Sequence, residues 1–250
     1  MRKLLRFEFR KLFRQKSFYG CNILLLIFIF LSAVISKVAI DNAEELTVPL
    51  PTTFEMVRSA LQGGNVILIL GVFTALFVCS DYTDGTMKNI YAKGYSRTNV
   101  YFSELIAVIT FSFIACIVSW GGGFVFGKMF FEIGEGLNGN LFGTLISQML
   151  VVFSYTGLFF ALTTVIKKTG ASIASCIIAP IIFSLLFTAV DSIIGNETFS
   201  LSNYWLDGFF GKLTQNTVMN NTLLVAAVFS VLYAVIFILI GWFINRKSEI

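Results

Sequence analysis

The 250-residue sequence contains no histidine and very little charge. Without histidine the chain lacks the commonest metal ligand and general base, which excludes a Ser-His-Asp catalytic set. Only 13% of its residues are charged, about half the share of a typical soluble domain. So few charged residues could not cover the surface of a soluble protein, and a soluble core could hardly hold 28 phenylalanines. These features predict a non-catalytic protein whose side chains mostly face lipid or neighbouring helices.

Cysteine is also scarce, and no two cysteines form a C-x-x-C motif. The four lie in or beside apolar segments, where a free thiol behaves as a small buried hydrophobe: Cys21, Cys79, Cys116 and Cys176. The sequence therefore predicts no disulfide, metal or cofactor in this chain. One near match to a P-loop, Gly122-x-x-x-x-Gly127-Lys128-Met129, lacks the Ser or Thr that holds Mg²⁺. We interpret it as accidental.

Six long apolar runs make up most of the chain and predict six transmembrane helices. They cover residues 20–40, 64–80, 101–127, 143–166, 173–194 and 222–244. Each run is long enough to cross roughly 30 Å of hydrocarbon at about 1.5 Å per residue. Pro180 lies inside the fifth run and is expected to kink it. The serines and threonines of the runs are expected to hydrogen-bond within or between helices.

Lysine and arginine are divided unequally between the two sides of these six runs. If the amino terminus is cytoplasmic, the cytoplasmic segments hold Arg2, Lys3, Arg6, Arg10, Lys11, Arg14, Lys16, Lys88, Lys93, Arg97, Lys167, Lys168, Arg246 and Lys247. The outer segments then hold Lys37, Arg58, Lys128 and Lys212. This bias predicts a multi-pass protein of the plasma membrane with both termini cytoplasmic. Because the basic residues do not form one face, we expect no nucleic-acid binding.

Residues 1–18 form a basic segment before the first run. Leu5, Phe9, Leu12 and Phe13 recur at spacings of three and four, and most basic residues fall on the rest of the wheel. This pattern is typical of a helix lying in the headgroup layer against anionic lipid. Its interfacial residues are predicted to be Arg6, Phe9, Arg10, Phe13 and Arg14. The alternative, a signal-peptide n-region, is disfavoured because no clear small-residue cleavage site follows. We therefore divide the chain into an interfacial helix, 1–18, and a six-helix membrane domain, 19–250.

Three segments are predicted to lie on the outer side. Residues 41–62 are acidic and contain Pro49 and Pro51, so we expect an irregular loop. Residues 128–142 are expected to form a Gly-rich turn. Residues 195–221 are aromatic and predict either short helices dipping into the interface or an ordinary aromatic belt. The stripe Gly123-x-x-x-Gly127 allows close helix contact, either within one subunit or between two.

The cytoplasmic loop between the second and third runs has the most distinctive pattern, SDYTDGTMKNIYAKGYSRTNVYFSEL, residues 80–105. Asp84 is expected to accept backbone N–H bonds at a helix start. Met87, Ile90 and Tyr91 would share one face of a short helix that ends at Gly94. Ser96 would then cap the next helix. Such an amphipathic helix suits docking into a cleft of a cytoplasmic partner, although spacing alone also allows a solvated polar loop.

This loop resembles that of the ABC-2 family of ATP-binding-cassette transporter permeases. The resemblance is carried by an acidic residue, Gly-Thr, a short helix and Ser-Arg, here Asp81, Asp84, Gly85, Thr86, Lys88, Ser96 and Arg97, with Glu104 opening the next span. The order of elements along the whole chain is also similar. The resemblance implies an all-α membrane protein of six transmembrane helices, like the transmembrane domain of type V exporters.

The same resemblance implies partners and roles. Such permeases pair with a second copy or a paralogue and bind separate cytoplasmic ATPase subunits, which hold ATP and Mg²⁺. The ATPase would couple through Asp81, Asp84, Gly85, Thr86, Met87, Lys88, Ile90, Tyr91, Ser96 and Arg97. Residues 1–18 would be the connecting helix, and residues 200–215 a re-entrant hairpin.

The predicted function is export of a hydrophobic or amphiphilic cargo: an antimicrobial peptide, a lipid or a drug. Phe-rich, weakly polar spans suit such cargo better than hydrated ions or sugars. Two alternatives stay open, a stand-alone secondary carrier or channel and a non-transporting membrane scaffold. Carboxylates paired inside the spans, as in many ion-coupled carriers, are missing from the sequence.

Overall fold

A computed structural model describes residues 1–41, 51–62, 64–134, 140–194, 200–214 and 219–247. These residues form helices and no strand. The helices are α1 (Arg2–Arg14), α2 (Lys16–Asp41), α3 (Thr53–Ser59), α4 (Asn65–Thr83), α5 (Thr86–Ala92), α6 (Arg97–Phe130), α7 (Asn140–Ile166), α8 (Thr169–Ile194), the 3₁₀ turn η1 (Ser202–Tyr204), α9 (Leu206–Leu213) and α10 (Asn220–Lys247). Of these, α2, α4, α6, α7, α8 and α10 are long and apolar enough to span a membrane. The predicted six spans are confirmed.

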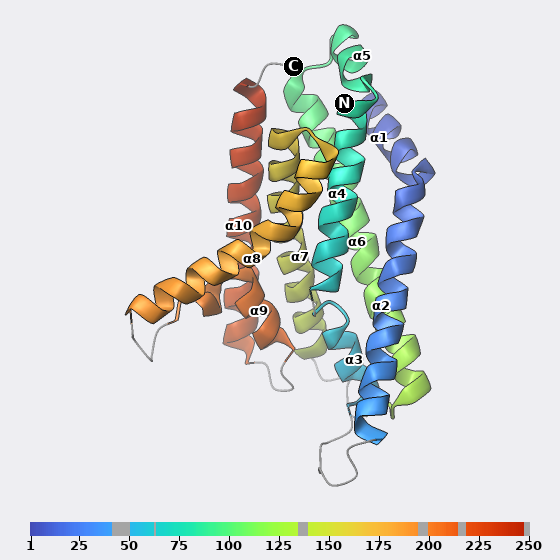
Figure 1. Cartoon of the computed structure of the whole chain (residues 1–250), viewed down its shortest axis with the longest axis vertical. Helices are drawn as coiled ribbons and strands as arrows, with labels where there is room; N and C mark the ends of the chain where they lie inside the picture. Colours follow the sequence, from blue (N-terminus) through green and yellow to red (C-terminus); the bar gives the residue numbers. More distant parts are fainter. Residues whose placement is uncertain (42–50, 63, 135–139, 195–199, 215–218, 248–250) are drawn as a thin grey trace.

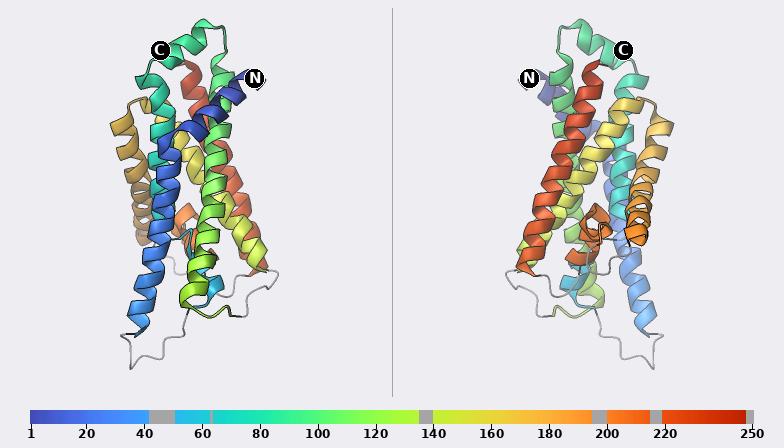
Figure 2. Two further views of the ribbon diagram at one scale, coloured as in Figure 1. Left: turned by 90° about the vertical axis from the view of Figure 1, so that its right-hand side faces the viewer. Right: turned by 90° about the vertical axis from the view of Figure 1, so that its left-hand side faces the viewer.

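The six long helices form one bundle with both chain ends at the same end (Figure 1). We call this the terminal end. It also carries α5, and α1 lies obliquely across it against α6 (Figure 2). The short helices α3 and α9 lie toward the opposite end (Figure 1). An even number of spans places the two chain ends on the same side of the bundle, which agrees with the distribution of lysine and arginine along the sequence.

The middle of the bundle is made by α4, α6 and α7, whose apolar segments are largely buried, whereas α2, α8 and α10 are mostly exposed on their outer sides. Phe73 of α4 stacks on Phe111 of α6. Hydroxyl groups link the helices as predicted: Ser112 and Thr156 lie 2.8 Å apart, and Ser154 donates to the carbonyl of Ser230 at 2.6 Å. The four cysteines are buried free thiols, as expected from their apolar surroundings.

The expected boundary of the first helix is wrong by several residues. Helix α1 ends at Arg14, Gln15 is extended with ψ 125°, and α2 begins at Lys16. The basic stretch of residues 1–18 therefore belongs to two helices, because one extended residue lets α1 turn away from the span.

The expectation of an irregular outer loop is wrong for Thr53–Ser59, which form α3. Thr52 and Glu55 make a reciprocal capping box at its start, which satisfies two backbone N–H groups. Residues 42–50, including Pro49, lie outside the described residues. The predicted turn at 128–142 begins later than expected because α6 continues to Phe130; residues 135–139 also lie outside the described part.

The glycine stripe of α6 serves packing within the subunit. A Cβ at Gly123 would come within 3.0 Å of the Met56 carbonyl oxygen, and one at Gly127 within 3.1 Å of the Thr53 Cα. These glycines therefore let α3 lie directly on α6. The resemblance of this stretch to a P-loop has no counterpart in the structure, since the residues are helical.

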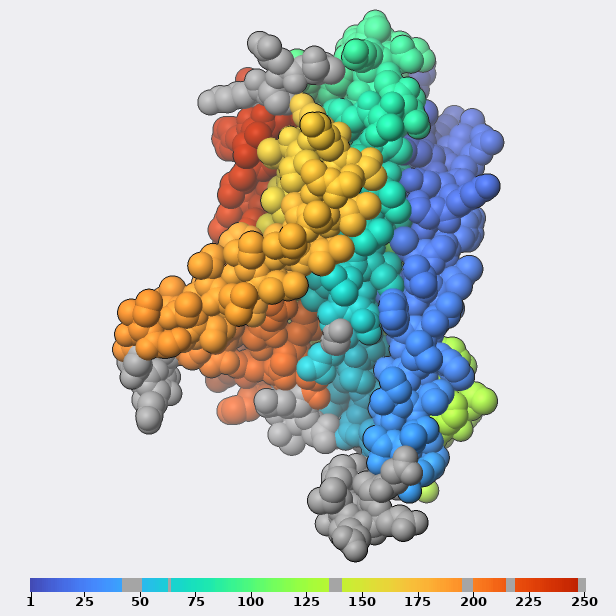
Figure 3. Space-filling view, viewed as in Figure 1, coloured from blue at the N-terminus to red at the C-terminus, as the bar shows by residue number. Residues whose placement is uncertain are grey.

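Helix α8 leaves the bundle along its second half, so it projects beyond the outline of the molecule (Figure 3). Its first half packs on α4 and α7. Pro180 lies inside the helix and is its last buried residue. A proline removes one backbone hydrogen bond from a helix and favours bending at that point.

Candidate functional site

The candidate site lies at the terminal end, where α1 meets α4, α5 and α6. Helix α1 turns one stripe toward the bundle, because Leu4, Glu8 and Leu12 recur every four residues and all three are buried. The residues predicted to be interfacial lie mostly elsewhere: Arg6, Arg10, Phe13 and Arg14 are exposed, and Phe9 is half-buried. Helix α1 therefore has an outward basic face and an inward face that contains an acid.

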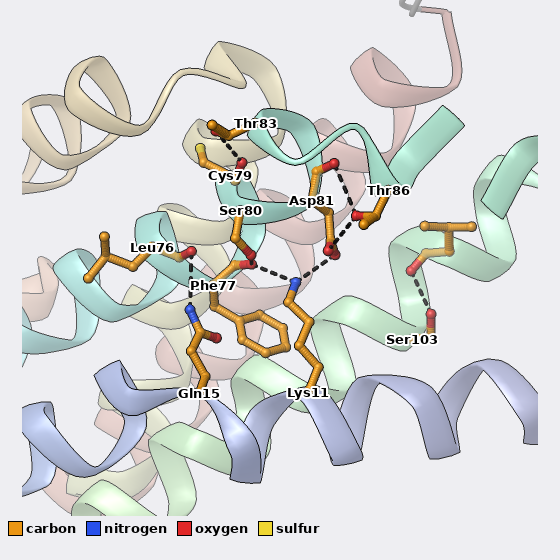
Figure 4. Close-up of polar contacts among 11 residues, drawn as sticks. Lys11, Gln15, Leu76, Phe77, Cys79, Ser80, Asp81, Thr83, Thr86 and Ser103 are labelled. Carbon is orange, nitrogen blue, oxygen red and sulfur yellow. Dashed lines mark hydrogen bonds and ion pairs between the residues drawn. The ribbon is translucent and has the colours of Figure 1, made fainter. Parts of the chain in front are cut away.

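Lys11 joins α1 to the end of α4 (Figure 4). Its Nζ donates to Oδ2 of Asp81 at 2.5 Å and to the carbonyl oxygen of Phe77 at 2.8 Å. The ammonium also lies 4.2 Å from the centre of the Phe77 ring. Just beyond the end of α1, Gln15 donates to the carbonyl of Leu76 at 3.4 Å. The two helices are thus joined through a partly buried, charge-assisted contact.

Asp81 also joins α4 to α5. Its Oδ1 accepts a hydrogen bond from the Thr86 hydroxyl at 2.9 Å (Figure 4). Between them the chain reverses at Gly85, which has a φ of 67° and serves as the N-cap of α5. A left-handed conformation of this kind favours glycine. The Asp81 carboxylate therefore binds α1 through one oxygen and α5 through the other.

The apolar face of α5 packs inward. Met87 and Ile90 are buried in a small cluster with Leu4 of α1 and Val100 of α6. The opposite face is exposed and carries Lys88, as predicted. The amphipathic pattern thus seats α5 on the bundle and leaves its polar face outward.

The remaining predicted residues frame α5. Asp84 is the C-cap of α4 and makes no side-chain cap for α5, so its expected role at a helix start is wrong. Gly94 has a φ of 81° and lies two residues beyond α5, as expected of a stop. Ser96 caps α6 by accepting the N–H of Asn99 at 3.3 Å, also as expected. Tyr91 and Arg97 are half-buried.

A cleft of about 430 Å³ opens between α1 and the end of α4. It is lined by residues of both charges, among them Arg10, Arg14, Asp81, Asp84 and Thr86. Two of the residues predicted on α1 and three of those predicted in the loop therefore border one shared opening.

Three residues of this region were not predicted as site residues: Glu8, Lys11 and Glu104. Glu8 of α1, Asp81 of α4 and Glu104 of α6 each offer a carboxylate oxygen, and these oxygens all lie within 4.8 Å of one another. Burial raises the pKa of Glu8 to about 7, with Lys11 acting in the opposite direction and Asp81 in the same one. The spacing Leu4–Glu8–Leu12 was the available signal, since it places an acid in the middle of an inward stripe.

The opposite end has a different character. Trp205, Phe209, Phe210 and Leu213 are buried. Trp205 stacks on Phe187 of α8 with ring centres 4.9 Å apart. Of the two alternatives for residues 195–221, η1 and α9 favour short helices, but buried aromatic rings of this segment pack into the bundle rather than forming an exposed belt.

One carboxylate lies beside this aromatic layer. Asp207 accepts a hydrogen bond from the Tyr155 hydroxyl at 2.5 Å, and burial raises the pKa of Asp207 above its ordinary value. It also lines an apolar pocket of about 350 Å³ between α4 and α8, together with Pro180 and Ser184. The projecting half of α8 thus borders an accessible apolar space with one acidic group.

Comparison with known proteins links these features to one family. A family model described as ABC-2 family transporter protein matches residues 4–191. The matched range contains α1, α4, α5 and the start of α6, and so the whole candidate site. No curated protein matches the chain in sequence.

Proposed function

The chain belongs to the ABC-2 family of transporter proteins and is thus a multi-pass membrane permease of an ABC transporter, and we propose that a separate cytoplasmic ATPase drives it as an exporter. The ATPase binds ATP and Mg²⁺ and docks on the exposed face of α5. A second permease subunit, identical or paralogous, completes the transporter.

The observation that carries this proposal is the double attachment of Asp81. A force on α5 passes through Thr86 to the Asp81 carboxylate and from there through Lys11 to α1. It also passes through Met87 and Ile90 to Leu4 and Val100. Motion of a partner bound to α5 would therefore move α1 together with the parts of α4 and α6 that lie at the terminal end.

The orientation of the membrane domain belongs to the same proposal. The terminal end carries α5 and both chain ends (Figure 1), and the basic residues concentrate in the segments at that end. Positively charged segments stay preferentially in the cytoplasm. This supports a plasma-membrane protein with cytoplasmic termini, in which α5 is within reach of a soluble ATPase.

The docking proposal is tested by site-directed cross-linking in native membranes. The native thiols are all buried, so a Lys88→Cys variant carries one accessible thiol on α5. Lys128→Cys is the matched control, since Lys128 is an exposed lysine of α6 at the opposite end. We expect Lys88→Cys to capture a nucleotide hydrolase that Lys128→Cys does not. Capture of no hydrolase, or capture at Lys128 alone, would contradict the proposal.

The cargo is proposed to be hydrophobic or amphiphilic, such as an antimicrobial peptide, a lipid or a drug. The support is the pocket between α4 and α8, whose lining is apolar apart from a few groups such as Ser184 and Asp207. Pockets that bind small amphiphiles combine apolar walls with few polar groups. A hydrated ion or a sugar would find too few hydrogen-bond partners there.

A blocking substitution tests this pocket. Ser184→Phe would fill the space between α4 and α8, and we expect it to reduce photolabelling of α8 by an amphiphilic diazirine probe. Leu186→Phe adds a ring to the same helix at an exposed position that does not line the pocket. Equal labelling of the two variants would mean that cargo takes another path.

A further inference from the structure

Three buried carboxylates from three helices converge at the terminal end. The exposed fractions are 0% for Glu8, 4% for Asp81 and 1% for Glu104. These residues come from α1, α4 and α6, and their nearest oxygens lie within 4.8 Å of one another. No short sequence motif contains all three residues. The packing of the three helices brings them together.

Two of these carboxylates have oxygens without a hydrogen-bond partner among the described residues. Both Oε1 and Oε2 of Glu8 are buried and unpartnered, and so is Oε1 of Glu104. By contrast, Asp81 is bonded to Lys11 and Thr86. A buried polar atom that lacks a partner destabilises the folded state, and a charged one does so more strongly. Glu8 and Glu104 thus direct free acceptor oxygens into the space that they share with Asp81.

The charges at this place do not balance. When all three carboxylates are ionised they contribute −3 and the ammonium of Lys11 contributes +1, which leaves −2 on this buried cluster. Either two protons or one divalent cation would neutralise it. We propose that Glu8, Asp81 and Glu104 bind one divalent cation that prefers oxygen ligands, of the Ca²⁺ or Mg²⁺ class.

The donor atoms fit this class of ion. All three ligands are carboxylate oxygens, and hard divalent cations prefer such ligands over nitrogen or sulfur. Two oxygens bound to one Ca²⁺ at about 2.3–2.6 Å can be at most about 5 Å apart, which is compatible with the observed limit of 4.8 Å. The sequence predicted no metal because it has no histidine and no paired cysteines.

The cation would hold α1 in place. Glu8 is the ligand from α1, and Asp81 and Glu104 belong to helices of the bundle. A bound ion would therefore fasten α1 to α4 and α6 next to the Lys11–Asp81 contact. This inference does not depend on the ATPase or the cargo, so it is tested on the purified chain alone.

The test measures Mn²⁺ binding by electron paramagnetic resonance on the full-length chain in detergent, after removal of metals with EDTA. We expect one saturable Mn²⁺ per chain, displaced by Ca²⁺. Glu8→Gln should weaken binding by at least about tenfold, since even indirect partners of a metal contribute that much. Glu132→Gln is the control, because Glu132 is an exposed acid at the opposite end and should bind Mn²⁺ as the unchanged chain does.

A double variant guards against simple misfolding. Glu8→Gln with Glu104→Gln removes two negative charges and leaves Asp81 paired with Lys11. This variant should bind no Mn²⁺, and its unfolding temperature should no longer respond to Ca²⁺, whereas that of the unchanged chain rises with Ca²⁺. Absence of saturable Mn²⁺ binding by the unchanged chain would overturn the proposal, and protons would then neutralise the site. Binding that survives in the double variant would overturn it equally.

Discussion

The two ends of the bundle are held together by different forces. At the terminal end, α1 and α5 are attached through the polar contacts of Asp81, Lys11 and Thr86, in addition to a small apolar cluster around Met87 and Ile90. At the opposite end, α9 is attached by stacked aromatic rings around Trp205. A charged contact has a defined geometry and fails when one partner is lost, whereas an aromatic layer loses contact area gradually. The terminal end is therefore suited to passing on motion, and the opposite end to adapting its shape.

The largest effect is expected from Lys11→Met at the terminal end. It leaves Asp81 buried without its ammonium partner, and breaking a buried pair in this way costs about 3–5 kcal/mol. Unfolding of the purified protein in a detergent titration measures the loss. Arg10→Met is the control, because Arg10 is exposed on the same helix and should change the free energy of unfolding by less than about 0.5 kcal/mol. Equal effects of the two changes would show that the Lys11–Asp81 contact does not stabilise the terminal end.

Trp205→Ala at the opposite end should cost less, about 2–3 kcal/mol. In a soluble core the loss would be about 3–5 kcal/mol, but a membrane protein unfolds into an apolar solvent, so chiefly the packing contribution is lost. The same detergent titration measures it. Phe243→Ala serves as control, since Phe243 is an exposed ring of α10 and should have almost no effect. A loss above that of Lys11→Met would reverse the comparison.

Gly85→Ala tests the joint between α4 and α5. The site is sterically open, but its φ of 67° is left-handed, so alanine should cost about 1–2 kcal/mol. In the assembled transporter we expect ATP hydrolysis to lose its stimulation by cargo. Gly121→Ala isolates the backbone contribution, because Gly121 is equally open but helical and should be neutral or slightly stabilising.

The smallest effect is expected midway between the ends. Ser112→Ala removes the hydrogen bond to Thr156 inside the bundle, and such bonds between membrane helices contribute about 0.6 kcal/mol. A double-mutant cycle with Thr156→Val measures the coupling. A value above about 2 kcal/mol would show that the middle of the bundle relies on polar contacts as strongly as the terminal end.

The sequence predicts the parts of this molecule that depend on local pattern. Six apolar runs predict six spans because length and composition decide that question almost alone. The stop at Gly94 and the cap at Ser96 are local signals as well. The capping box of Thr52 and Glu55 was also readable, but the surrounding acids and prolines indicated a loop.

The polar centre of the site could not be predicted in the same way. Glu8, Asp81 and Glu104 lie on three helices far apart in the sequence, and no periodicity links them. In the sequence, Lys11 cannot be told from the other basic residues of α1. Among the described contacts, it alone of these residues forms an ion pair with Asp81. Only the tertiary arrangement separates the half-buried Lys11 from its exposed neighbours. The amphipathic pattern of α5 gave its buried face but not which helices that face contacts.

Helix α5 is only seven residues long and is bounded by left-handed glycines. Helices shorter than about 12 residues are marginal in water on their own. Its helical structure therefore depends on contacts with Leu4 of α1 and Val100 of α6, which cover Met87 and Ile90. If α1 detaches from the bundle, α5 should lose its helical structure too, and hydrogen exchange of its amides would report at a distance whether the amino-terminal helix is seated.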